Sequence, residues 1–128
     1  MDQVEKKVTV VIVTFKSNFA IENCLKSIDD KFKKIIIENS GDNLIKKKIE
    51  RDYVNTTVVL SSNIGFGSAV NLGVKNSQTS YVFSINPDVT LKENTIKELH
   101  QGAEGLKDDF SILAPVDYEK NLTKPVSA

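Results

Sequence analysis

Residues 8–15 read VTVVIVTF, an almost unbroken run of apolar and β-branched side chains. Such residues favour strands, and a strand that is apolar on both faces is typical of a parallel sheet covered on both sides. The run therefore predicts a central strand. It is far too short to cross a membrane or to form the core of a signal peptide.

Shorter strand-like runs and helical patterns alternate along the rest of the chain. The strand-like runs lie at residues 34–38, 57–60, 81–85 and 110–114. Apolar residues recur at helical spacing between them, so the order predicts an α/β fold with a mostly parallel, Rossmann-like sheet and helices on both faces. Ser17 or Asn18 is expected to cap the first helix, and Thr90 with Glu93 has capping-box spacing for the last one.

The overall composition indicates one globular domain over residues 1–128, with 116–128 as a loop or frayed tail. Seventeen basic residues balance seventeen acidic ones, so no net charge would attract a nucleic acid. The lysines near residues 31–34 and 46–48 are expected on solvated helix faces. Cys24 is the only cysteine, which excludes internal disulfides and predicts a small core residue in a cytoplasmic protein.

The polar residues that follow the strands predict a ligand site. In an open α/β sheet the carboxyl ends of parallel strands deliver their loops to one edge, where ligands bind. After the fourth strand the sequence reads Asn86-Pro87-Asp88. Proline has no N–H for a strand ladder, so it ends the strand, and the carboxylate that follows is a candidate ligand for Mg²⁺ or Mn²⁺. Taken alone, Pro87-Asp88 is more often an ordinary turn.

A glycine-rich segment, NIGFGSAVN at residues 63–71, follows the third strand and opens a helix. Gly65 and Gly67 would allow a nucleotide to approach the backbone and the helix N-terminal amides, although a tight turn with close packing is about equally plausible for either glycine alone. Val70 stands where the dinucleotide fingerprint requires its third glycine, so we do not assign that motif.

Together these stretches resemble the first half of a family-2 glycosyltransferase with the GT-A fold. The resemblance runs from Val8 to about Pro115 and is carried by four segments, of which the last two in this order are the most specific. They are VIVTF at 11–15, IIENS at 36–40, the segment from Asn63 to Gly73, and FSINPD at 83–88.

The resemblance implies a nucleoside-diphosphate sugar donor, UDP- or dTDP-linked, a divalent Mn²⁺ or Mg²⁺ ion, and transfer to a glycan or lipid-linked acceptor hydroxyl with inversion. Asp88 would bind the metal at the place of the family's D-x-D motif. The residues expected around the nucleotide are Thr14, Phe15, Glu38, Asn63, Gly65, Gly67, Asn71 and Asn86. The N-P-D form is similar to that of rhamnosyltransferase-like members, which make cell-surface polysaccharides.

Glu38 and Asn86 each replace a more usual aspartate of the family pattern. No residue is assigned as the general base, because family members carry it in a later segment. The alternative is a non-catalytic nucleotide-binding or scaffold module of the same fold. We expect a cytoplasmic protein without a transmembrane segment, which is either free in the cytoplasm or peripheral at the inner membrane face. If a sheet edge is left uncovered, we expect homo-oligomers. A phosphoreceiver-like signalling domain is a third alternative, suggested by the alternation of strands and helices. We reject it because this chain has no acidic residues directly after its first and third strands, where such a domain requires them.

Overall fold

The computed structural model describes residues 3–16 and 20–106. The chain divides into two compact units, Met1–Leu91 and Lys92–Ala128, and each is described by itself. The single domain over residues 1–128 therefore stays a prediction. Several predicted features lie outside the described residues: the cap at Ser17 or Asn18, the strand at 110–114 and the tail at 116–128.

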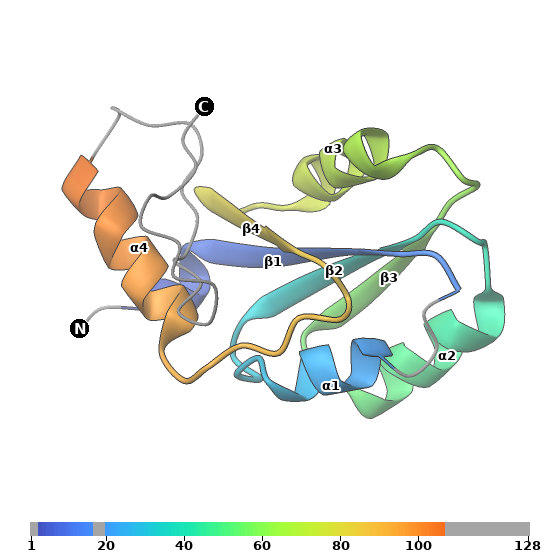
Figure 1. Ribbon diagram of the computed structural model, residues 1–128, viewed down its shortest axis with the longest axis horizontal. Helices are drawn as coiled ribbons and strands as arrows, with labels where there is room; N and C mark the ends of the chain where they lie inside the picture. The colour runs from blue at the N-terminus through green and yellow to red at the C-terminus, as the bar shows by residue number, and fades with distance from the viewer. Residues whose placement is uncertain (1–2, 17–19, 107–128) are drawn as a thin grey trace. The chain divides into compact units, whose positions relative to one another are not determined.

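The first unit is built on a parallel sheet. Its strands are β1 (Val8–Thr14), β2 (Lys33–Glu38), β3 (Thr56–Leu60) and β4 (Tyr81–Ile85). The strand order is β3-β2-β1-β4, and every pair is parallel (Figure 1). β1 is buried along its whole length. The prediction of a central strand is confirmed, and the four strands lie within one residue of their predicted ranges.

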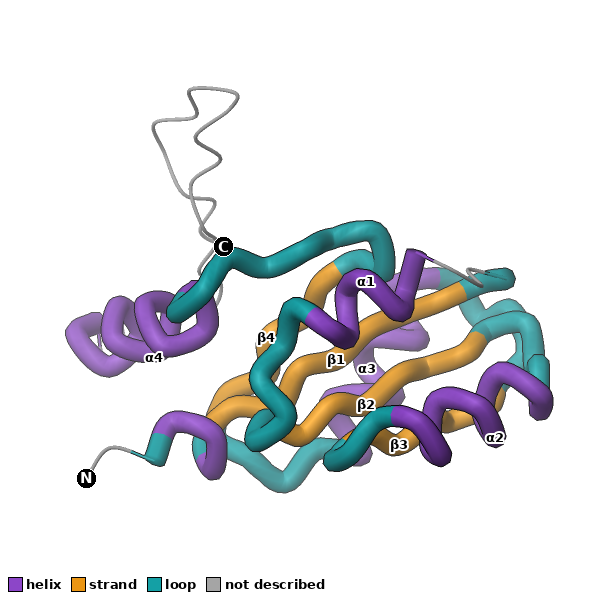
Figure 2. The backbone as a smooth tube through the Cα atoms, turned by 90° about the horizontal axis from the view of Figure 1, so that it is seen from below, coloured by secondary structure: helices purple, strands orange, loops and turns teal. Residues whose placement is uncertain are grey.

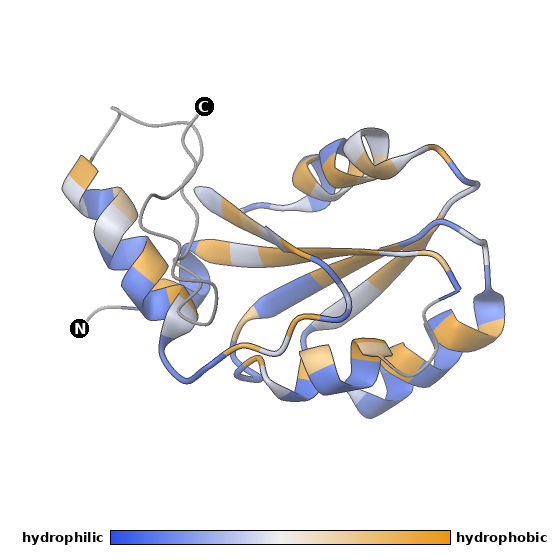
Figure 3. Ribbon diagram, viewed as in Figure 1, coloured by the Kyte–Doolittle hydropathy of each residue, from blue (hydrophilic) through white to orange (hydrophobic). Residues whose placement is uncertain are grey.

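Helices cover both faces of this sheet. α3 (Phe66–Asn76) lies on one side, and α1 (Ala20–Lys26) and α2 (Asn43–Asp52) lie on the other (Figures 1 and 2). Asp42 caps α2, because its Oδ1 accepts hydrogen bonds from the backbone of Leu44 and Ile45. The central strand β1 is mainly apolar in colour, whereas β2 has hydrophilic ends and the helices are mixed (Figure 3).

The core on the α3 side is made of β-branched side chains from the two central strands. Val11, Val13, Ile35 and Ile37 pack there with Ala69 of α3. Each such side chain stabilises the fold by about 1.5–3 kcal/mol when fully buried. One turn further along α3, Gly73 lies against Val11, and a Cβ at this glycine would be 2.5 Å from Val11 Cγ1. The absence of a side chain therefore sets how closely the helix approaches the sheet.

The prediction that the first lysine cluster lies on a solvated helix face is wrong for its last two members. Lys33 and Lys34 belong to β2, and Lys34 is only 1% exposed. Its Nζ donates a hydrogen bond of 3.0 Å to the backbone carbonyl of Phe32. Burial lowers the pKa of Lys34, while the nearby Asp30 and Asp29 act in the opposite direction. The charge pattern gave a wrong prediction for Lys34 because the long apolar stem of a lysine can pass through apolar surroundings to a polar partner.

The outer edge of β3 is closed by two side chains of α2. Lys34 N donates to Asn55 O, so the backbone N–H and C=O groups of alternate residues along β3 point toward β2. Those of Val58 point away from β2, to the outer edge of the sheet. Glu50 Oε2 accepts from Val58 N at 2.8 Å, and Lys46 Nζ donates to Val58 O at 2.6 Å. The two side chains also pair with each other at 2.9 Å. The ion pair thus occupies the hydrogen-bonding positions that another strand would use.

The described part of the second unit contains the helix α4 (Thr95–Leu106). The predicted capping box at Thr90 and Glu93 is wrong, because the helix begins later. Asn94 has φ +69°, a left-handed backbone conformation that cannot continue a right-handed helix. Within residues 3–16 and 20–106, no helix has the length and apolar character needed to cross a membrane.

Candidate nucleotide and metal site

The exits of β1, β2 and β3 are bonded to one another at the carboxyl edge of the sheet. Asn39 N donates to Thr14 O at 2.8 Å, and Ser61 N donates to Glu38 O at 3.0 Å. Ser61 Oγ also donates to Asn39 Oδ1 at 2.7 Å. The side-chain carbonyl of Asn39 is therefore held by the neighbouring exit. The exits of these three strands thus lie at one edge, as predicted, and hydrogen bonds join them to one another.

Glu38 is completely buried at this edge. Its Oε1 accepts from Ser40 N at 2.9 Å, and Ser40 Oγ lies 2.5 Å from Oε1 and 2.8 Å from Oε2. A carboxylate bonded in this way closes the turn after β2. Because Glu38 is completely buried, a ligand N–H or O–H group could reach the carboxylate only if neighbouring atoms moved aside. Sequence reasoning placed Glu38 at the right edge but did not indicate this local partner.

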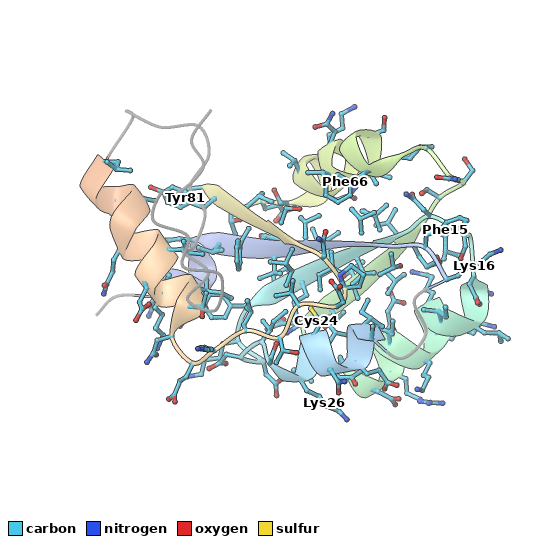
Figure 4. The ribbon with its side chains drawn as sticks, in the orientation of Figure 1. Phe15, Lys16, Cys24, Lys26, Phe66 and Tyr81 are labelled. Carbon is cyan, nitrogen blue, oxygen red and sulfur yellow. The ribbon has the colours of Figure 1, made fainter. Side chains whose placement is uncertain are left out.

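Thr14 is the last residue of β1 and is paired with Glu38 in the register of β1 and β2. Phe15 follows it. Thr14 Oγ1 is buried and has no hydrogen-bond partner within the described part of the chain. Phe15 is 49% exposed, and Lys16 Nζ lies 5.4 Å from the centre of its ring. Figure 4 shows Phe15 and Lys16 at the opposite end of the sheet from Tyr81, which begins β4. An exposed aromatic face at this edge can stack on a flat ring.

The glycine-rich segment follows β3 at the same carboxyl edge. Gly65 is the N-cap of α3 with φ +84°, a conformation that favours glycine. Gly67 lies in the first turn of α3, and a Cβ there would meet nothing within 4 Å. Asn63 and Asn71 are both exposed. The backbone of this turn is therefore open to a ligand, and Gly65 has in addition the purely structural role expected of a tight turn.

The segment after β4 forms a turn with Asp88 at its tip. Val89 N donates to Asn86 O at 3.2 Å, so Pro87 and Asp88 are the central residues of a β-turn. Asp88 does not have a positive φ, which excludes a type II turn. Asn86 and Asp88 are both exposed. Pro87-Asp88 thus forms a turn, which leaves the carboxylate accessible at the edge where β4 ends and does not decide between an ordinary turn and a ligand role.

The donor set at this edge suits a hard divalent ion only in part. Among the described residues there is no group of three or more His, Cys, Asp or Glu side chains that could hold a metal. Asp88 offers one accessible carboxylate. Mg²⁺ and Mn²⁺ prefer oxygen ligands and often take several of them from phosphate and water, so the site fits an ion that arrives with a diphosphate. Within the described residues, no hydrogen bond or ion pair joins Asp88 to the Gly65 turn.

Two residues of the α1 region contact the Asp88 turn and were missed as site residues by the sequence analysis. Cys24 is buried, as predicted, and its Sγ lies 3.9 Å from Asn86 O. Burial raises the pKa of the Cys24 thiol to about 11, and the Asp88 carboxylate adds to this increase. Ser27, directly after α1, accepts a hydrogen bond from Leu91 N at 2.9 Å. No sequence signal distinguishes this serine from an ordinary helix-end residue.

Comparisons with known proteins give a matching family and similar proteins. The sequence profile described as Glycosyl transferase family 2 matches residues 9–127. The low-salt glycan biosynthesis hexosyltransferase Agl10 of Haloferax volcanii is 22% identical over 111 residues, which cover 84% of this chain and 35% of that protein. The crystal structure of S. aureus TarS 1-349 has a TM-score of 0.64 at 20% identity, covering 77% of this chain and 32% of that one.

The parallel sheet with helices on both faces and a polar carboxyl edge defines an α/β protein of the GT-A kind, and the TarS comparison supports this fold. The chain belongs to glycosyl transferase family 2. It spans about a third of the length of the relatives it matches, 35% of the hexosyltransferase and 32% of the TarS chain.

Proposed function

We propose that this chain is the donor- and metal-binding part of a glycosyltransferase that uses a nucleoside-diphosphate sugar. The observation that carries the proposal is the exposed Asp88 carboxylate, held at a turn on the carboxyl edge of the sheet. The family membership supports the reaction class. The sequence Asn86-Pro87-Asp88 resembles that of rhamnosyltransferase-like members and is compatible with a dTDP-linked donor, and a UDP-linked donor is the other candidate.

Each group at the edge has a distinct role in this proposal. Phe15 stacks on the nucleobase, and Glu38 accepts from the base or ribose once neighbouring atoms move aside. The backbone around Gly65 and Gly67 packs against the nucleotide, with Asn63, Asn71 and Asn86 as polar neighbours. Mn²⁺ or Mg²⁺, when bound at Asp88, would stabilise the charge on the leaving diphosphate.

In the complete reaction, an acceptor hydroxyl of a glycan or lipid-linked sugar displaces the nucleoside diphosphate in one step. The C–O bond to the acceptor forms as the bond to the diphosphate breaks, which inverts the anomeric carbon. The hydroxyl proton goes to a general base outside the residues assigned here. The chain's own part is to bind the donor and place its diphosphate at Asp88.

The test is calorimetric binding of UDP and dTDP with Mn²⁺ and with EDTA. We expect Mn²⁺ to tighten binding of at least one nucleotide about tenfold or more, a difference of roughly 1.4 kcal/mol. Asp88→Asn should remove most of this gain. Asp30→Asn, an exposed carboxylate before β2 at the other end of the sheet, should keep it. Equal affinities with and without Mn²⁺ in the wild-type chain would overturn the proposal, as would equal losses in the two variants.

A non-catalytic nucleotide-binding module of the same fold is the second candidate. Such a module would also bind the nucleotide, but it would not transfer a sugar. Sugar transfer by the chain to an acceptor in a mixed glycan and lipid extract would eliminate it.

A further inference from the structure

The segment that carries Asp88 is attached to the α1 region at both ends. At its start, Asn86 O accepts from Val89 N and lies 3.9 Å from Cys24 Sγ. At its end, Leu91 N donates to Ser27 Oγ at 2.9 Å. Asp88 lies between the two attachments. A carboxylate on a short segment fixed at both ends has few directions in which it can point.

The Ser27 hydroxyl is the stronger of the two attachments. It donates to Cys24 O at 2.6 Å while it accepts from Leu91 N. Both roles of the hydroxyl are thus filled, which fixes the position of its oxygen. The contact from Cys24 is long and comes from a weak thiol donor, so it adds packing more than bonding. Ser27 therefore determines where the segment meets the end of α1.

We propose that Ser27 is a positioning residue for the metal ligand Asp88: its hydroxyl anchors the Leu91 end of the Asn86–Leu91 segment to the end of α1, so that the carboxylate is held ready for a divalent ion. This inference rests on the proposed function of the site. Without the hydroxyl, Leu91 N loses its partner and the Asp88 turn is held at one end only. Nucleotide contacts at the exits of β1 and β2 do not involve Ser27.

The chain offers a matched control in Ser77, which follows α3. Its Oγ donates to Val74 O at 2.8 Å, the same bond to the third preceding residue that Ser27 makes to Cys24. Ser77 precedes β4 and lies at the end of the sheet away from Asp88. Ser27→Ala and Ser77→Ala therefore remove equivalent helix-end bonds, but only the first also removes an acceptor from the Asp88 segment. Ser27→Thr keeps the hydroxyl.

The first measurement is amide hydrogen exchange of the ligand-free chain, resolved by residue. In Ser27→Ala, exchange at Leu91 and Val89 should rise about three- to tenfold, the change expected for one partly buried hydrogen bond. Ser77→Ala should leave both amides unchanged, and Ser27→Thr should resemble the wild type. Fast exchange at Leu91 in the wild type would overturn the inference without any reference to metal.

The second measurement is the ratio of UDP or dTDP affinity with Mn²⁺ to affinity with EDTA. Ser27→Ala should reduce this ratio about three- to tenfold and leave the affinity in EDTA unchanged. In an Asp88→Asn background it should have no further effect, because the group it positions is gone. A normal ratio in Ser27→Ala would show a merely structural serine and overturn the inference alone. A wild-type chain without any Mn²⁺ effect, but with a protected Leu91 amide, would overturn the proposed function and with it this role.

Discussion

The contact between Gly73 and Val11 predicts how one added methyl group changes stability. In Gly73→Ala the new Cβ would lie 2.5 Å from Val11 Cγ1 and 3.1 Å from Cγ2. Carbon atoms in favourable contact are about 3.5–4.0 Å apart, so the overlap is about 1 Å. Val11 is fully buried and β-branched, which leaves its side chain little room to rotate away.

The expected change in the free energy of unfolding is the difference between the cost of overpacking and the gain from replacing a helical glycine. Overpacking of a core costs about 1–3 kcal/mol, whereas alanine in place of a helical glycine gains up to about 1 kcal/mol. We therefore expect Gly73→Ala to lower the free energy of unfolding by about 1 kcal/mol, which lowers the melting temperature by about 4 °C. Gly67→Ala is the control, since its Cβ would meet nothing within 4 Å, and it should be neutral or stabilising.

Guanidinium unfolding of both variants measures these terms. The destabilisation in Gly73→Ala should shrink in a Val11→Ala background, because the overlapping methyl groups are then absent. If Gly73→Ala is as stable as Gly67→Ala, the close approach of α3 to β1 does not depend on this glycine and the reasoning is refuted.

Two further predictions concern charged side chains of the first unit. Hydrogen bonds from Lys48 and then Tyr53 lower the pKa of Glu22 from its ordinary value of 4.5, so its contribution to stability is present above that value and is lost as pH falls through the lower folded-state pKa. The stability difference between wild type and Glu22→Gln should accordingly disappear on acidification, and a difference that persists at low pH would contradict this. In Lys46→Ala/Glu50→Ala the edge of β3 loses its covering ion pair, so light scattering should detect larger assemblies than for Lys47→Ala, an exposed neighbour on α2. Identical masses for the two proteins would argue against that role.

The parallel sheet was predictable because its strands are short apolar runs separated by helical patterns. The period of apolar residues and the length of each run depend on local sequence alone, so the ranges of β1 to β4 followed from the chain itself. The start of α4 could not be predicted in this way, because the capping-box spacing of Thr90 and Glu93 carries no information about the left-handed backbone at Asn94.

The candidate site was predictable in its outline but not in its contacts. The parallel arrangement places the exits after Thr14, Glu38 and Ile85 at one edge, and this followed from the order of elements. The bond from Leu91 to Ser27 joins residues 64 positions apart, and nothing in the local sequence of either indicates the other. The buried position of Lys34 was missed because its surroundings are set by the packing of the strands, although its hydrogen-bond partner, Phe32 O, is only two residues away.

The ion pair of Lys46 and Glu50 at Val58 also limits how copies of this chain could polymerise. A sheet with two available sides can add molecules without end and grow into a fibril, whereas a sheet with one available side stops after two molecules join. Within residues 3–16 and 20–106, β4 has a strand partner on one side only. If copies of this described sheet joined by strand addition at β4, the addition would end at a symmetric pair.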